Sequence, residues 1–158
     1  MMPESWYPFF EWCEGTLLGS AVRDSIYAFP LIEALHLVAL CVMGGALIVV
    51  DLRLLGLGLK QQGIAQLAAQ VRPWLVGGIV VMLGTGVLLF LSEAIKCFYN
   101  TAFWVKILTL PVALIFTFAV RERLLDGLDT GLSSRLLGAT SLALWFVVAA
   151  AGRWIGFS

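Results

Sequence analysis

The sequence predicts an all-α integral membrane protein, a bundle of four transmembrane helices that forms a single domain over residues 1–158. Of the 158 residues, 61% are hydrophobic and 13% are charged, whereas soluble domains are nearer half apolar and a quarter charged. The apolar residues gather in four long blocks, each long enough to cross a hydrocarbon core of about 30 Å. Backbone in lipid must satisfy its own hydrogen bonds, so these blocks are expected to be helices.

The four predicted spans cover residues 26–50, 74–91, 101–120 and 136–157. Pro111 lies inside the third span and is expected to kink it, because proline removes a backbone donor. Trp145 lies in the middle of the fourth span and is expected in the core. The other tryptophans lie near span ends or in flanking segments, where aromatic side chains anchor helices at the membrane interface.

Two flanking segments are expected to lie at the membrane interface. Residues 5–19 mix Trp, Tyr and Phe with two glutamates, which is typical of an interfacial helix at the headgroup boundary. Residues 60–74 carry apolar side chains at helical spacing: Ile64, Leu67, Ala68 and Val71. This spacing predicts a short amphipathic helix between the first two spans, with Pro73 separating it from the second span.

Lysine and arginine are unevenly divided between the two sides of the predicted bundle. The segments after the first and third spans carry six of them: Arg53, Lys60, Arg72, Arg121, Arg123 and Arg135. The opposite side carries Arg23 and Lys96. The positive-inside rule then predicts that both termini lie outside the cytoplasm, in the periplasm for a bacterial inner-membrane protein. Asp51 and Arg53 are expected at the cytoplasmic interface, where the first span ends.

The three cysteines show no metal-binding spacing. Cys41 lies inside the first span and is expected to be a small core residue. Cys13 and Cys97 fall on the same predicted side, which is oxidising, so a disulfide between them is a candidate. Whether their Cα atoms approach within about 7 Å decides it.

The predicted spans contain ionisable residues, although each costs about 2.5–3.5 kcal/mol to insert. Glu33 and His36, the only histidine, are three residues apart and share one helix face. Counting 1.5 Å per residue places His36 and Lys106 each roughly 22 Å from the cytoplasmic ends of their spans. Glu33 and Arg153 lie at roughly 27 Å. The sequence therefore predicts a cluster in the outer half of the bundle, with His36 level with Lys106 and Glu33 level with Arg153.

Three interpretations of this cluster remain open from the residues alone. It is a ligand or cofactor site, or Glu33 pairs with Arg153 or Lys106 and only holds the helices together. In the third interpretation the ionisable groups carry ions or protons, which for so few helices requires a homo-oligomer. The lipid bilayer is the expected partner. A net charge of zero gives no basic surface for nucleic acid.

Short motifs in three of the spans resemble those of a known group of proteins. The first span contains HLVALCVMGGALIVVDLRLLG, the second ends in TGVLLF and the third opens with AFWVKILTL. They resemble the CopD-like group of small four-helix membrane proteins, which includes copper-resistance D proteins and HemJ-type protoporphyrinogen oxidases. The chain looks most similar to an uncharacterised bacterial family in or near this group, with a Glu-x-x-His first helix, a DLRL end, an RPW start and an AGR-x-IG terminus. The resemblance covers about residues 26–157.

The resemblance implies a haem b site. In HemJ-type proteins a first-helix histidine is a haem b ligand and a third-helix lysine after a tryptophan is needed for activity. His36 and Lys106 match these positions, so His36 would be the metal ligand. In the cofactor interpretation, Lys106 and Arg153 would hold propionates or stabilise an anion, and Glu33 would orient His36 or relay a proton. HemJ-type proteins carry further histidines that this chain lacks, so one protomer offers a single histidine ligand. No enzymatic activity follows from these residues.

Overall fold

The computed structural model describes residues 4–59, 61–125 and 131–157, and it contains helices and no strand in these ranges. Four helical segments are long and apolar enough to cross a membrane: α3 (Ala28–Leu54), α4 (Ile64–Ser92), the third segment (Thr101–Leu124) and α8 (Leu132–Ile155). The prediction of an all-α bundle with four membrane-spanning helices is confirmed. The helices extend beyond the predicted spans mainly at the end of the bundle opposite the two chain termini.

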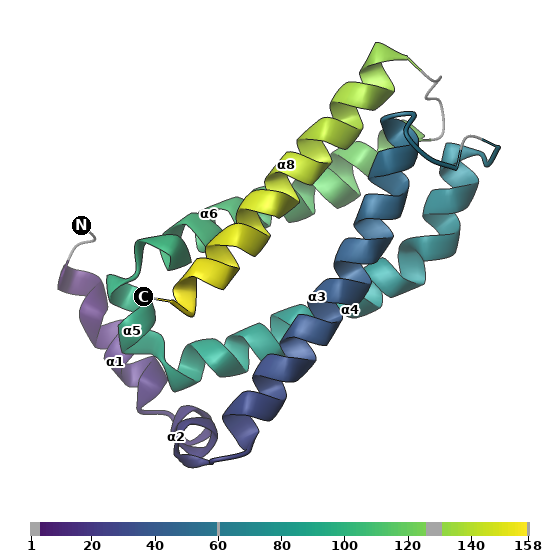
Figure 1. The fold of residues 1–158 in the computed structure, drawn as a ribbon. Coiled ribbons are helices and arrows are strands. Elements are labelled where there is room, and N and C mark those ends of the chain that lie inside the picture. Colours follow the sequence, from purple (N-terminus) through teal and green to yellow (C-terminus); the bar gives the residue numbers. More distant parts are fainter. Residues whose placement is uncertain (1–3, 60, 126–130, 158) are drawn as a thin grey trace.

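The four long helices are arranged as two pairs. Helix α3 packs along α4, and α8 packs along α6 (Thr101–Ile115), while α3 against α8 joins the two pairs. We call the end where α3 stops and α8 starts the loop end, and the opposite end, where both chain termini lie, the terminal end (Figure 1). The ribbons of the two pairs lie near each other at the loop end and separate toward the terminal end (Figure 1).

Short helices cover the terminal end: η1 (Glu4–Trp6), α1 (Tyr7–Glu14), α2 (Leu17–Asp24) and α5 (Ala94–Tyr99). The single interfacial helix predicted for residues 5–19 is thus two helices. The break follows from Thr16, whose extended backbone and hydroxyl oxygen cap α2 by accepting a hydrogen bond from the Gly19 amide at 3.2 Å. Exposed aromatic side chains, among them Trp12, remain on this cap as expected for a membrane interface.

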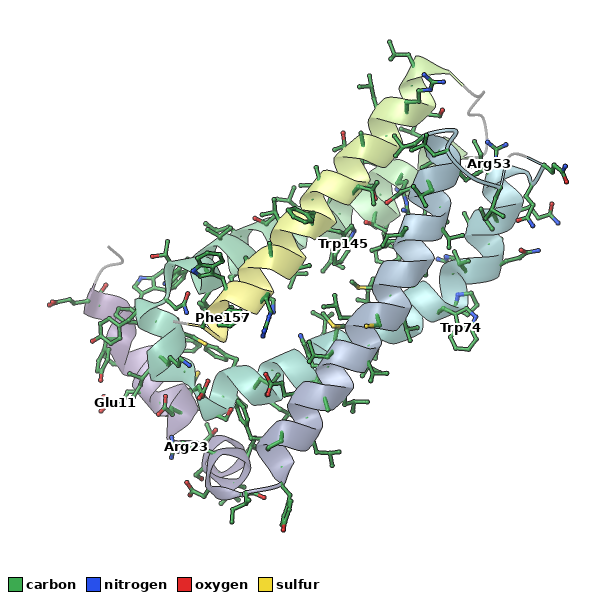
Figure 2. The ribbon with its side chains drawn as sticks, in the orientation of Figure 1. Glu11, Arg23, Arg53, Trp74, Trp145 and Phe157 are labelled. Carbon is green, nitrogen blue, oxygen red and sulfur yellow. The ribbon has the colours of Figure 1, made fainter. Side chains whose placement is uncertain are left out.

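Helix α4 differs from its prediction. The separate amphipathic helix expected in residues 60–74 is the first part of α4, which starts at Ile64 and passes through Pro73 without a break. Its apolar face is buried against other helices, since Ile64 packs with Val50 and Leu54 of α3. Spanning helices tolerate the hydrogen bond lost at proline when neighbouring structure supports the chain. Trp74 points away from the bundle (Figure 2).

The third spanning segment contains a change of helix type. Helix α6 runs through Pro111 and continues into a π-helical stretch, η2 (Phe116–Arg121), followed by α7 (Glu122–Leu125). A π-helical turn bonds i to i+5 and so shifts the face on which later residues lie. Thr117 and Arg121, one turn apart, are both buried. The segment predicted to end at residue 120 therefore keeps Arg121 inside the bundle.

Three clusters of apolar side chains form the core. The central cluster joins the four spanning helices and consists of Met43, Ala46, Leu47, Leu75, Ile79, Ala113, Trp145 and Val148. A second cluster at the loop end contains Val50, Leu54, Ile64 and Leu137, and a third beneath the cap contains Phe10, Cys13, Ala94, Cys97, Phe98 and Phe103. The core position predicted for Trp145 is confirmed (Figure 2). The core position predicted for Cys41 is wrong, because Cys41 is exposed.

Candidate functional site

The face of α3 that builds the core changes from apolar to polar toward the terminal end. Leu47 and Met43 are each 2% exposed and lie in the central cluster. About two and three helical turns beyond Met43, the same face carries His36 and Glu33. His36 is partly exposed and Glu33 is exposed. The apolar core therefore stops between Met43 and His36, and polar groups follow it.

The His36 ring is held by a threonine of α4. His36 Nδ1 lies 2.8 Å from Thr85 Oγ1. Thr85 Oγ1 in turn lies 2.6 Å from the carbonyl oxygen of Val81, to which it donates. A hydroxyl has one proton, so Thr85 accepts from His36 and the imidazole carries its proton on Nδ1. This assignment leaves the Nε2 lone pair available, the usual form of a histidine that binds a metal or accepts a proton.

Two glycines border the polar groups closely. A Cβ atom at Gly86 of α4 would lie 3.4 Å from His36 Cε1, so the ring rests against the α4 backbone. A Cβ atom at Gly152 of α8 would lie 3.3 Å from Lys106 Nζ. Both positions give room to an ionisable side chain from another helix.

Lys106 lies on the core-facing side of α6, between Phe103 and Ala113, which are both buried. Its charge is close enough to act on the His36 ring. Within the ranges that the structure describes, the Lys106 ammonium group has no hydrogen-bond or ion-pair partner. The structure thus places Lys106 within electrostatic range of His36, without a hydrogen bond or ion pair between them, and Lys106 has no counter-charge among the described residues.

The structure does not bring Glu33 and Arg153 together. Both side chains are exposed, and neither forms an ion pair in the described part of the chain. The Arg153 guanidinium instead lies 4.1 Å from the centre of the Phe157 ring, a cation–π contact. Thr85, and not Glu33, contacts the His36 ring. Sequence reasoning missed Thr85 because its contact depends on how α4 is rotated against α3. We call His36, Thr85 and Lys106 the terminal polar cluster; Glu33 and Arg153 lie nearer the terminal ends of α3 and α8 and are exposed.

A second polar cluster lies at the loop end, where the sequence predicted interfacial charges. Arg121 Nη1 donates to Asp51 Oδ1 at 2.8 Å, and their side chains are 2% and 0% exposed. Arg121 Nη1 also lies 3.4 Å from Ser141 Oγ of α8. The prediction that Arg121 belongs to a loop is wrong, because Arg121 lies inside the third spanning segment and is buried. Asp51 is buried as well, near the end of α3, and its interfacial depth stays a prediction. We call Asp51, Arg121 and Ser141 the loop-end polar cluster.

A further buried hydrogen bond supports the loop-end polar cluster. Trp145 Nε1 donates to Thr117 Oγ1 at 2.9 Å, which ties the π-helical stretch to α8. Because Thr117 and Arg121 are four residues apart, the same contact fixes the face on which Arg121 lies. Ala113, Thr117 and Arg121 are spaced four residues apart in the sequence. This helical spacing was the signal that could have predicted that the three residues share one buried face.

The two cysteines of the predicted disulfide lie in one buried cluster between α1 and α5. Cys13 and Cys97 are both free thiols there, and their pairing stays a prediction. Burial raises the pKa of the Cys97 thiol to about 11, with a further rise from the Glu93 carboxylate. Burial also raises the pKa of Cys13. Both thiols are therefore protonated at neutral pH.

Alkylation of Cys97 in the reduced, folded protein is expected to be slow at pH 7 and to accelerate as the pH approaches about 11. In the unfolded chain the thiol ionises near its ordinary pKa of about 8.5. Folding holds the thiol protonated, so this contribution to stability is complete below the unfolded pKa and is lost as the pH rises through the folded value. Mass spectrometry of iodoacetamide-treated protein across pH measures it. Equal rates for folded and denatured protein at pH 8 would contradict it.

No group of three or more His, Cys, Asp or Glu side chains is placed to hold a metal ion within the described residues. A metal at the terminal polar cluster would thus take one protein ligand, His36, from this chain.

Taken together, the fold and the two polar clusters define a multi-pass four-helix membrane protein with ionisable groups inside the bundle. The chain belongs to a family of unknown function (DUF6644), whose model matches residues 9–158. No curated protein and no solved structure matches it. The predicted membership of an uncharacterised family is thereby supported, while the likeness to CopD-like and HemJ-type proteins rests on the sequence motifs.

Proposed function

We propose that this membrane protein binds an anionic, amphiphilic cofactor at the terminal polar cluster, with haem b as the specific candidate. The observation that carries the proposal is the geometry of His36. Its Nδ1 donates to Thr85, its Nε2 has no hydrogen-bond partner among the described residues, and the unpaired Lys106 cation lies nearby. A neutral imidazole beside an uncompensated cation favours a ligand that offers both a metal and a carboxylate.

The residues present fit haem b in part. His36 Nε2 suits the iron of a haem, and Lys106 and Arg153 suit its two propionates. With one histidine, this chain would supply a single ligand to the iron, or, in a homo-oligomer, two protomers would share the cofactor. When bound, the haem would supply one-electron redox chemistry.

The protein's own residues would hold and orient this ligand. Thr85 fixes the imidazole tautomer and keeps the ring against Gly86. Lys106 would bind a carboxylate inside the bundle, and Arg153 would bind one nearer the membrane surface. Glu33, one helical turn from His36 and exposed, would exchange protons with the aqueous phase.

A visible spectrum tests the proposal. Protein expressed with ample haem and purified in mild detergent is expected to show a Soret band that His36→Ala abolishes. Thr85→Val is expected to weaken or shift the band, because His36 loses the partner that fixes its tautomer. Cys41→Ala, an exposed position on the same helix, is the matched control and should retain the full band. Absence of the band in the wild type, or its survival in His36→Ala, would refute haem binding.

A structural role is the second candidate, as an accessory subunit whose buried charges hold helices together. The Asp51–Arg121 pair favours it, since this pair joins α3 to the third spanning segment.

Ion or proton translocation has less support. The apolar central cluster lies between the terminal and loop-end polar clusters, and a path through the bundle would have to open it. If the protein carries ions into proteoliposomes and Glu33→Gln abolishes that flux, translocation would be favoured over the structural role.

We further propose a bacterial inner-membrane location with both termini in the periplasm. Arg121 no longer counts as a loop charge, because it is buried and paired. The loop end still carries more basic residues than the terminal end, which retains Arg23 and Lys96. Tags at either terminus should be accessible from the periplasmic side.

A further inference from the structure

The buried ion pair leaves two polar atoms without partners. Asp51 Oδ2 and Arg121 Nε are buried and form no hydrogen bond among the described residues. The cause is the geometry of the pair, since Arg121 approaches Asp51 with a single Nη1–Oδ1 bond. A bidentate arginine–carboxylate pair would use two parallel bonds and leave fewer groups unpaired.

Other buried polar side chains nearby have partners. Ser134 Oγ donates to the Leu54 carbonyl oxygen at 3.1 Å, and Thr117 accepts from Trp145 at 2.9 Å. The two unpaired atoms are therefore a local property of the Asp51–Arg121 pair. Buried polar groups without a partner are rare and costly, so each needs a ligand or a solvent molecule.

We propose that the Asp51–Arg121 pair, with Ser141 beside it, is a binding site for internal water at the loop end. The unpaired groups are one acceptor, Asp51 Oδ2, and one donor, Arg121 Nε, and water serves both. The pair carries no net charge. A cation would be repelled by Arg121 and an anion by Asp51, so a neutral molecule fits best.

The site lies near one end of the spanning segments. Asp51 lies in the last turn of α3, close to the end of the spanning segment. The π-helical stretch ends at Arg121, on the facing side. A water molecule that reaches the pair from the loop end does not cross the apolar central cluster, and the two side chains, 0% and 2% exposed, must shift to admit it.

A wild-type structure at a resolution that shows ordered water tests the proposal directly. We expect density within hydrogen-bond distance of Asp51 Oδ2 and of Arg121 Nε. A bidentate Asp51–Arg121 pair, a dry void beside the two atoms, or an ion identified by anomalous scattering would overturn it.

Variants supply a second measurement. Asp51→Leu combined with Arg121→Met is expected to lose the water density, whereas Ser141→Ala is expected to keep it because both unpaired atoms remain. Density that persists in the double variant would show that the pair does not hold the water. If the double variant does not fold, the wild-type density decides the question alone.

Discussion

Arg121→Met is expected to lower the free energy of unfolding by about 3–5 kcal/mol. Arg121 is 2% exposed, and its removal leaves the Asp51 carboxylate buried without a cation. Breaking a buried pair by removing one partner costs more than the pair itself contributes, because the remaining charge has lost both water and counter-charge. Thermal unfolding in detergent, followed by circular dichroism, measures the loss.

Arg123→Met is the matched control, because Arg123 lies two residues further along and is exposed. It is expected to stay within about 0.5 kcal/mol of the wild type. The double variant Asp51→Leu with Arg121→Met should recover most of the loss, since it removes both charges together. A double variant that is as unstable as the sum of its single variants would mean that the two residues act independently.

The four spans could be predicted because length and hydropathy decide them. A block of about 20 apolar residues has few alternatives to a membrane helix. The start of α4 was misplaced because Pro73 was read as a boundary, whereas the apolar face before it is buried on α3 through Ile64. Local sequence does not show which surface such a face will meet.

The polar clusters were predicted unequally for a physical reason. His36 and Lys106 lie well inside apolar blocks, so their depth alone indicated that they face the bundle. Asp51 and Arg121 lie at the ends of apolar blocks. The hydropathy of the sequence there is the same whether each residue is an interfacial charge or a member of a buried ion pair. Only the Asp51–Arg121 contact, and the π-helical stretch that ends at Arg121, separate the two cases.

Gly19→Ala is expected to destabilise the protein by about 1–3 kcal/mol or more, through overpacking. Gly19 lies where α2 crosses the end of α4, and a Cβ atom there would lie 2.4 Å from the Leu91 carbonyl oxygen. It would also lie 3.1 Å from the carbonyl oxygen of Glu14. Both obstacles are backbone atoms, which cannot rotate away as a side chain would, so α2 must move off α4.

Gly45→Ala is the matched control, because Gly45 also lies inside a helix and a Cβ atom there meets nothing within 4 Å. It should be neutral or stabilise the protein by up to about 1 kcal/mol, the difference between glycine and alanine in a helix.

In Gly19→Ala, a displaced α2 should also loosen the cap. Arg23 of α2 donates to one carboxylate oxygen of Glu14, and the other oxygen of Glu14 accepts from the Ile95 amide of α5. Faster alkylation of Cys97 in Gly19→Ala than in Gly45→Ala would report this loosening. If both variants unfold at the same temperature and their thiols react alike, α2 is not held by this close contact.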